Sequence, residues 1–168
     1  MNIYNIAAAV ALARKLGIGM SAIQHAVSEL GYVEHRLEMK LHQDMVLIDD
    51  AFNANPEGAA AACDVLAQMP GWRILVTPGM IDLGEQQEQF NRCLGTHAAG
   101  CADEVILVGG KQVQPLRQGL VEGGFDEDRI RQVMTMQEAL LALNKARMQT
   151  RSCSSRTSSA RSASTAAF

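Results

Sequence analysis

The sequence lacks a long apolar run, a surplus of charge of one sign and any paired-cysteine motif. No apolar run is long enough to cross a bilayer, and the first residues do not have the positive start of a secretory signal. The net charge of −3 gives no reason to expect nucleic acid or an acidic membrane surface as a partner. With 168 residues, 48% of them hydrophobic, the chain is long enough for one globular domain with its own core.

Cysteine is scarce and irregularly spaced. The four cysteines form no C-x-x-C pair, and no histidine lies at the spacing of a zinc finger. We therefore predict that Cys63, Cys93 and Cys101 are small buried residues in a reducing compartment, and that a disulfide or a zinc ligand is the less favoured alternative. His97 lies on the same helix face as Cys93 and Cys101, which favours a buried structural histidine over a catalyst.

Glycine-rich phosphate loops are also missing. The sequence has no G-x-x-x-x-G-K-[ST] motif, and Gly109-Gly110 follows an apolar run without completing G-x-G-x-x-G. These two absences exclude a P-loop and a dinucleotide fingerprint within this sequence.

Alternating helix and strand signals are what the sequence does contain. An alanine-rich helix over residues 3–16, ended by Gly17, comes first, and a second helix begins at Ser21 with Gln24 at capping-box spacing and ends at Gly31. The later strands are expected near residues 37–41, 45–48, 73–77, 104–108 and 129–133, and the later helices near 55–69, 86–99, 113–121 and from 135 onward. This order predicts an α/β fold with a Rossmann-like, mostly parallel sheet and helices on both faces. The Ser-, Arg-, Ala- and Thr-rich tail from about Gln149 has too little apolar content to fold and is expected to be disordered.

The clearest candidate site is the segment 49–56, which reads D-D-A-F-N-A-N-P. It runs from a strand end through a polar turn into a helix N-terminus, where open α/β sheets bind ligands. Carboxylates and amides there suit ribose hydroxyls, and the helix N-terminus suits an anion. The local alternative is that Asn53 and Asn55 only shape the turn and cap the helix, with both aspartates solvated.

The same segment resembles the D-D-x-Y-N-A-N-P signature of the Mur ligase family, with Phe52 in place of tyrosine. Further blocks resemble the family in the same order, namely N-I-Y-N at 2–5, R-L-E at 36–38, T-P-G-M-I-D-L-G-E at 77–85 and V-I-L-V-G at 105–109. The third of these departs from the family at Asp82, where glutamate is usual. The resemblance covers roughly residues 2–147.

The resemblance implies three parts and a set of nucleotide contacts. Residues 1–35 match the last two helices of the family's central ATPase domain, 36–148 its C-terminal domain, and 149–168 a low-complexity tail. It further implies that Asn5 contacts adenine, Arg36 reaches the ATP phosphates as the catalytic cation, and Asp50 rather than Asp49 binds the ribose, with Asn53 beside them. A guanidinium fork suits a phosphate. The plain alternatives are a surface ion pair for Arg36 with a neighbouring glutamate, and a solvent-facing Asn5.

The dipeptide side of the site follows from the same resemblance. Asn55 would border the cleft, and the loop containing Thr77, Gly79 and Met80 would lie near the incoming dipeptide. The alternative for this loop is a turn needed only to reverse the chain.

The function implied is that of a fragment of a cytoplasmic, ATP-dependent amide ligase of peptidoglycan precursor synthesis. Such an enzyme uses ATP and Mg²⁺ to join D-alanyl-D-alanine to UDP-N-acetylmuramoyl-tripeptide. Without a P-loop, and with the family's N-terminal and central domains missing, this chain alone is expected to be inactive, to hold neither ATP nor Mg²⁺ tightly and to supply no metal ligand. The alternatives are a non-catalytic remnant or binding module, and a relative that adds another residue, against which the N-A-N-P turn argues.

The tail departs from the family, whose last strand resembles D-x-V-V-L-F-E-N. Codons exist for residues 149–157 whose other frame reads D-A-V-V-L-F-E-N, so we hypothesise an out-of-frame tail; the alternative is a natural low-complexity tail. Losing the last strand would leave a neighbouring strand edge unpaired and lower the stability.

Overall fold

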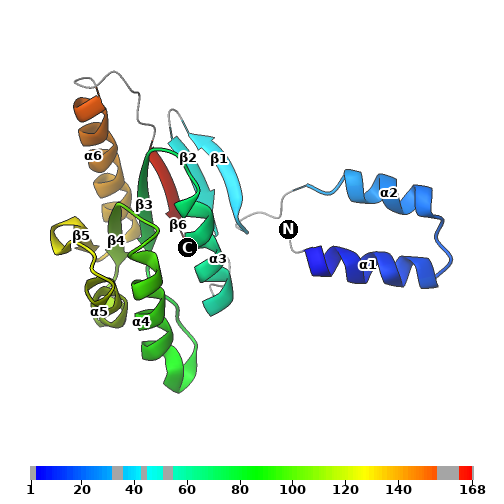
Figure 1. Ribbon diagram of the computed structural model, residues 1–168, viewed down its shortest axis with the longest axis horizontal. Helices are drawn as coiled ribbons and strands as arrows, with labels where there is room; N and C mark the ends of the chain where they lie inside the picture. Colours follow the sequence, from blue (N-terminus) through cyan, green and yellow to red (C-terminus); the bar gives the residue numbers. More distant parts are fainter. Residues whose placement is uncertain (1–2, 32–35, 43–44, 51–54, 155–162, 168) are drawn as a thin grey trace.

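The computed structural model describes residues 3–31, 36–42, 45–50, 55–154 and 163–167. These residues form six α-helices and one six-stranded sheet (Figure 1). The helices are α1 (Ile3–Lys15), α2 (Met20–Ser28), α3 (Pro56–Ala67), α4 (Gln87–Ala98), α5 (Gln114–Glu122) and α6 (Met136–Ser154). The strands are β1 (Glu38–His42), β2 (Met45–Asp49), β3 (Trp72–Thr77), β4 (Glu104–Val108), β5 (Ile130–Val133) and β6 (Ala163–Ala167).

The sheet has the strand order β1-β2-β6-β3-β4-β5. The β1–β2 pair is antiparallel, and every other neighbouring pair is parallel. Parallel neighbours need a crossover, and α3, α4, α5 and α6 lie between successive strands of the chain. The predicted mostly parallel α/β sheet is confirmed.

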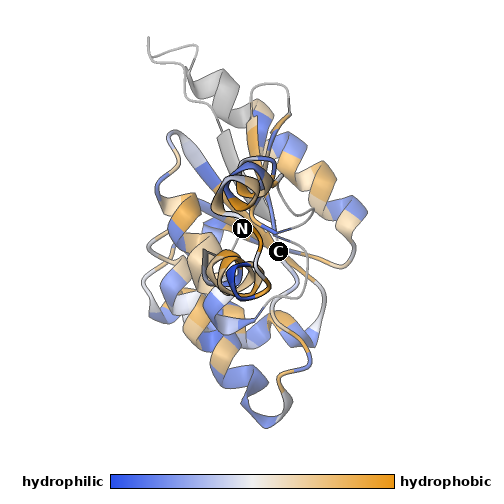
Figure 2. Ribbon diagram, turned by 90° about the vertical axis from the view of Figure 1, so that its right-hand side faces the viewer, coloured by the Kyte–Doolittle hydropathy of each residue, from blue (hydrophilic) through white to orange (hydrophobic). Residues whose placement is uncertain are grey.

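Alternating side chains of the central strands feed two separate cores. Leu75 and Leu107 pack with residues of α3, α4 and α5, whereas Ile74 and Ile106 pack with residues of α6. Successive strand residues point to opposite faces, so one strand supplies both layers. The prediction of helices on both faces is confirmed, and hydrophobic stretches alternate with hydrophilic ones along the helices, as Figure 2 shows.

Helices α4 and α5 pack unusually closely because glycine lies at their contact. A Cβ on Gly95 would stand 2.2 Å from the carbonyl oxygen of Leu116, and a Cβ on Gly119 would stand 1.9 Å from that of Arg92. Both distances are shorter than any allowed contact, so only glycine permits this approach. The closely packed α4–α5 pair contributes Leu94, Leu116 and Leu120 to the core that also contains Leu75 of β3 and Leu107 of β4.

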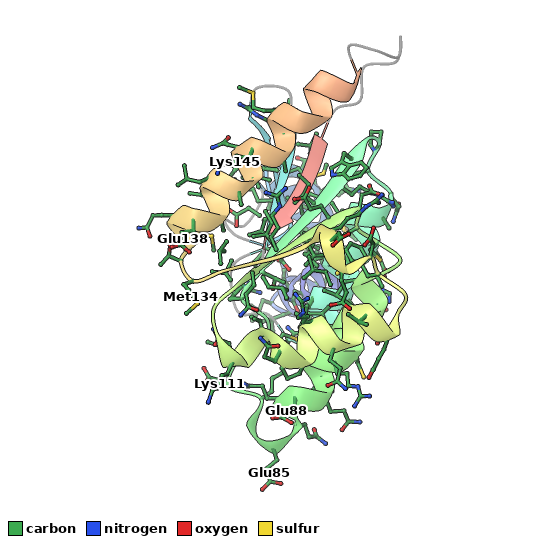
Figure 3. All side chains as sticks on the ribbon, turned by 90° about the vertical axis from the view of Figure 1, so that its left-hand side faces the viewer. Glu85, Glu88, Lys111, Met134, Glu138 and Lys145 are labelled. Atoms are coloured by element: carbon green, nitrogen blue, oxygen red, sulfur yellow. The ribbon has the colours of Figure 1, made fainter. Side chains whose placement is uncertain are left out.

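Most helix boundaries agree with their sequence signals. Asn55 caps α3, and the predicted capping box of α6 is present, since Thr135 Oγ1 accepts from the Glu138 N–H at 3.2 Å. Glu138 in turn accepts from the Met134 N–H at 2.8 Å at the start of α6 (Figure 3). The capping box predicted at Ser21 is wrong, because α2 begins at Met20. Its N-cap residue is Gly19, which makes no side-chain hydrogen bond to the helix.

The C-terminal segment differs from its prediction. Disorder is expected from about Gln149, yet α6 continues to Ser154, and residues 163–167 form β6 in the middle of the sheet. Residues 155–162 and 168 lie outside the described part. The composition argument considers only side-chain burial, whereas β6 is held through its backbone by β2 on one side and β3 on the other. The strand edge expected to lack a partner is therefore paired with β6 in this structure.

Helices α1 and α2 lie side by side and stand apart from the sheet (Figure 1). Ile23 is buried between them, but Leu12, Leu16 and Leu30 are each at least half exposed. Apolar surface of this kind normally packs on another element. The helix pair therefore has an unfilled apolar face, as its sequence predicts.

Candidate functional site

The carboxyl end of β2 meets the start of β1 at Asp50. The backbone N–H of Leu37 donates to Asp50 Oδ1 at 2.9 Å, and Asp50 is half-buried. Leu37 has a φ of +48°, a region that non-glycine residues seldom adopt. Because Arg36 directly precedes Leu37, this bond brings the two predicted nucleotide residues Arg36 and Asp50 to the same corner of the sheet.

Burial and a nearby cation have opposite effects on the pKa of Asp50. Burial raises the pKa of Asp50 above its usual value, while the Leu37 hydrogen bond and the positive charge of Arg36 act in the opposite direction, and Asp49 adds to the rise. Arg36 itself is exposed. The corner thus combines a partly desolvated carboxyl with an accessible guanidinium, a pairing suited to a ligand that offers hydroxyls and phosphates.

Asp49 has a different environment from Asp50. Its Oδ2 lies 3.0 Å from Lys40 Nζ, which also lies 2.9 Å from Glu38 Oε2. The hydrogen bond to Glu38, and to a smaller extent the one to Asp49, raise the pKa of Lys40. Asp49 is therefore engaged in a cross-strand contact between β1 and β2.

Helix α3 begins at the same edge of the sheet. Asn55 adopts an extended backbone, and its Oδ1 accepts from the Gly58 N–H at 2.8 Å, with Pro56 in the first turn. The local interpretation of Asn55 as a cap is thus confirmed, while its predicted role in binding stays a prediction. Asn53 lies outside the described residues.

The loop after β3 is held from within. Thr77 is fully buried and its Oγ1 accepts from the Gly79 N–H at 3.0 Å. Gly79 has a φ of +76°, and Met80 is 2% exposed, packed in the core beside α4 and α5. The side chains of Thr77 and Met80 therefore shape the loop from inside, and a ligand at this loop would meet backbone groups and the exposed neighbours.

Sequence reasoning missed Asn91, which fixes this loop. Asn91 is 1% exposed; its Oδ1 accepts from the Met80 N–H at 2.8 Å, and its Nδ2 donates to the carbonyls of Met80 at 2.8 Å and Gln87 at 2.9 Å. A signal was present, since Asn91 lies three residues before Leu94 and seven before Ala98, both buried. A polar residue on a core-facing helix stripe needs a partner, and here the partner is the loop.

The helix face predicted for α4 is rotated in the structure. Cys93 and His97 are exposed, whereas Cys63 and Cys101 are buried. The prediction of burial is thus wrong for Cys93 and His97 and confirmed for the other two cysteines. Helical spacing alone admits adjacent stripes; in the structure the buried stripe is the one with Asn91, Leu94 and Ala98, which faces the loop after β3 and the core.

The predicted residues are brought together only in part. Arg36, Asp50 and Asn55 lie where β2 leads into α3, and Thr77 to Met80 follow β3 at the same edge of the parallel sheet. Asn5 is exposed on α1, which stands apart from the sheet (Figure 1), so the structure does not place it beside Arg36. Of the helices that the structure describes, none combines the length and apolarity needed to span a membrane.

Comparison with known proteins gives consistent sequence relatives. The profile of the family described as "Mur ligase, glutamate ligase domain" matches residues 35–152. UDP-N-acetylmuramoyl-tripeptide--D-alanyl-D-alanine ligase of Escherichia coli (strain K12) is 38% identical over 112 residues, which are 66% of this chain and 25% of that protein. The enzyme of the same name from Bacillus subtilis (strain 168) is 26% identical over 147 residues, 86% of this chain and 32% of that protein.

Solved structures are similar over nearly the whole chain. A crystal structure of MurF from Acinetobacter baumannii has a TM-score of 0.77 at 26% identity and covers 97% of this chain and 33% of that one. MurF ligase from Thermotoga maritima, solved in complex with ADP, has a TM-score of 0.68 and covers 98% and 34%; at 20% identity this likeness concerns the fold. The chain spans about a quarter to a third of the length of these relatives. It belongs to the Mur ligase family, and residues 35–152 are the family's C-terminal, glutamate ligase domain.

Proposed function

We propose that this chain is the part of an ATP-dependent amide ligase that closes over the nucleotide and positions D-alanyl-D-alanine for addition to UDP-N-acetylmuramoyl-tripeptide. The observation that carries the proposal is the Leu37–Asp50 hydrogen bond, which sets Arg36 and Asp50 at one corner. The relatives that share this domain are named for that ligation.

The proposed chemistry gives each residue of the corner a defined task. ATP transfers its γ-phosphoryl group to the terminal carboxylate of the tripeptide, and the amine of D-alanyl-D-alanine then attacks the acyl phosphate and releases phosphate. Arg36 would neutralise charge on the transferring phosphoryl group, and Asp50 would accept from the ribose hydroxyls. Asn5 would approach adenine only when α1 and α2 pack on further protein.

The loop after β3 would position the dipeptide. Gly79 is buried against Asn91, and Thr77 and Asn91 hold the loop in one shape. Asn53 and Asn55 would border the cleft from the α3 side. A loop fixed before the ligand arrives loses less entropy on binding, which supports a positioning role.

A second candidate function is a non-catalytic binding module. The observation that favours it is the absence of a G-x-x-x-x-G-K-[ST] loop from the sequence, because the ATP phosphates then have no cradle within this chain. Magnesium and most phosphate contacts would have to come from other domains.

A fusion experiment tests the proposal. The N-terminal and central domains of the Escherichia coli relative are joined in frame to this chain from Arg36 onward, and phosphate release is measured with ATP, Mg²⁺, UDP-muramoyl-tripeptide and D-alanyl-D-alanine. We expect turnover with the dipeptide, none with D-glutamate or a diamino acid, and none from the chain alone. Arg36→Ala should abolish turnover in the fusion. A folded fusion that binds the nucleotide without turnover would favour the binding module.

A further inference from the structure

Three potential metal-binding side chains meet between α3 and α4, away from the nucleotide corner. Asp64 lies on α3, His97 in the last turn of α4 and Cys101 just beyond it. Their donor atoms all lie within 4.8 Å of one another, and His97 Nε2 is 2.8 Å from Asp64 Oδ1. His97 and Cys101 are four residues apart at the end of α4, where the Cys101 thiol donates to the carbonyl of His97 at 3.4 Å.

The cluster lies at the opposite edge of the sheet from Asp50. Asp103, two residues after Cys101, donates its N–H to the carbonyl of Arg73 near the beginning of β3. Helix α4 starts after the carboxyl end of β3 and runs back to this amino edge. A ligand held here is therefore separate from any nucleotide held at Arg36 and Asp50.

The donor types suit a borderline divalent metal. Imidazole nitrogen, thiolate sulfur and carboxylate oxygen are the usual ligands of zinc, and three protein ligands leave one tetrahedral position for water. In a tetrahedral site with zinc–ligand bonds of about 2.0–2.3 Å, two donors lie about 3.3–3.8 Å apart. The donor atoms of the cluster lie within 4.8 Å of one another, so side-chain shifts of about 1–1.5 Å reach that geometry. The carbonyl end of α4 also favours a cation.

Access and charge are compatible with entry of an ion. The Asp64 and His97 side chains are 59% and 42% exposed, whereas Cys101 is 6% exposed. The nearby cation Arg73 is already engaged, since its Nε and its Nη2 each lie 2.9 Å from a carboxylate oxygen of Asp103. The buried sulfur thus lies close to an exposed carboxylate and an exposed imidazole.

The sulfur that lies within 4.8 Å of the Asp64 and His97 donor atoms is that of Cys101, and Cys63 is not part of the cluster. Burial, followed by Cys101 and Asp64, raises the pKa of Cys63 to about 12, so Cys63 stays a thiol. Burial and then Asp64 also raise the pKa of Cys101, while Arg73 opposes the rise. A bound cation supplies the charge that a thiolate at Cys101 otherwise lacks.

We propose that Asp64, His97 and Cys101 bind one zinc-class divalent ion, with water as fourth ligand, and so clip α3 to α4. On binding, Cys101 releases its thiol proton to solvent. The proton that His97 Nε2 donates to Asp64 is released to solvent when Nε2 binds the metal, and the bound imidazole carries its one remaining proton on Nδ1, taken up from solvent if that nitrogen was unprotonated. The inference does not depend on the proposed ligase function.

Cobalt titration of the full chain tests the site. The reduced, chelator-treated protein is titrated with Co²⁺ while visible and near-ultraviolet absorption is recorded, and Zn²⁺ is then added. We expect one Co²⁺ per chain, the intense visible bands of tetrahedral cobalt, a thiolate-to-cobalt charge-transfer band, and displacement by Zn²⁺.

Matched variants identify the ligands. Cys101→Ser should remove the charge-transfer band, Asp64→Asn should weaken Co²⁺ binding by about tenfold or more, and Cys93→Ser should change nothing, although Cys93 is the more exposed thiol. Asp64→Asn is a surface change that leaves the fold intact, so it serves even if Cys101→Ser misfolds. The proposal is overturned if the wild-type chain gives no charge-transfer band, if the band survives in Cys101→Ser, or if Asp64→Asn binds Co²⁺ unchanged.

Discussion

The backbone N–H of Leu37 donates a 2.9 Å hydrogen bond to Oδ1 of Asp50, across thirteen residues of sequence. Leu37 makes this contact with a φ of +48°, a conformation that costs a non-glycine residue about 1–2 kcal/mol. A strained residue persists where its surroundings fix it, and such residues gather at functional sites. The bond therefore explains how the chain entering β1 is pinned to the end of β2, with Arg36 beside it.

Substitutions at Asp50 distinguish the effect of its hydrogen bond to Leu37 from the effect of its negative charge. Because the folded-state pKa of Asp50 is raised, chiefly by burial, its contribution to stability is present below about pH 3.8 and is lost as the pH rises through the folded-state pKa. Asp50→Asn keeps an acceptor for Leu37 and removes the charge. We expect its urea midpoint at pH 7 to equal or exceed that of the wild type.

The matched change is Asp50→Ala, which leaves the Leu37 N–H without its acceptor and should cost about 1–3 kcal/mol. In the fusion enzyme both variants should lose nucleotide affinity. Equal nucleotide affinity of Asp50→Asn and the wild type would remove Asp50 from the proposed ribose contact.

The loop after β3 depends on glycine at position 79. A Cβ at Gly79 would stand 2.7 Å from Asn91 Oδ1, and its φ of +76° disfavours any other residue. Gly84 shares the positive φ, at +59°, but has open space around it. Gly84→Ala should therefore cost about 1–2 kcal/mol and Gly79→Ala more, as measured by urea unfolding. Gly31→Ala, in open space without a positive φ, is the neutral control; equal losses at 79 and 84 would contradict the steric argument.

Asn91 should matter through each of its hydrogen bonds. Asn91→Ala leaves the buried Met80 N–H and carbonyl unpaired, at about 1–3 kcal/mol for each group. Asn91→Asp retains the acceptor for Met80 but loses both Nδ2 donations, so its loss of stability should be comparable or larger because a charge is then buried. Denaturant unfolding measures both, with exposed Gln89→Ala as a control on the same helix. An Asn91→Ala chain as stable as the wild type would show that the loop does not need this side chain.

The Arg73–Asp103 pair should give an acid-dependent contribution to stability. Although burial acts to raise it, hydrogen bonds from the Arg73 side chain and backbone lower the pKa of Asp103 overall. Its stabilisation is therefore present above about pH 3.8 and disappears as the pH falls through the folded-state pKa. Asp103→Asn should lower the free energy of unfolding by about 1.5–3 kcal/mol at pH 7. The difference in this free energy between the variant and the wild type should become smaller below about pH 3.8. A gap that does not change with pH would contradict the assignment.

The C-terminal segment can be tested by deletion. Removing residues 149–168 takes away β6, which pairs with β2 and β3 at once, and leaves two facing edges without partners. We expect the shortened chain to lose cooperative thermal unfolding and to bind a dye specific for exposed apolar surface. A sharp transition equal to that of the full chain would show that the sheet does not depend on β6.

Sequence patterns predicted much of this fold because they act over short distances. The buried strand at residues 104–108, the Asn55 cap and the Thr135–Glu138 capping box depend on neighbours within a few positions, and all three are present in the structure. The D-D-A-F-N-A-N-P segment marked the corner of the site for the same reason. Family resemblance then supplied roles that no local rule contains.

Only the tertiary structure decided which distant residues meet. Asn91 is buried against the loop after β3, Asp64 reaches His97 across 33 residues, and residues 163–167 enter the sheet by pairing with both β2 and β3. Each of these contacts joins groups far apart in the chain, whose pairing depends on the packing of whole elements. The sequence by itself determined the kinds of element and the location of the polar corner, while packing determined which polar groups became partners.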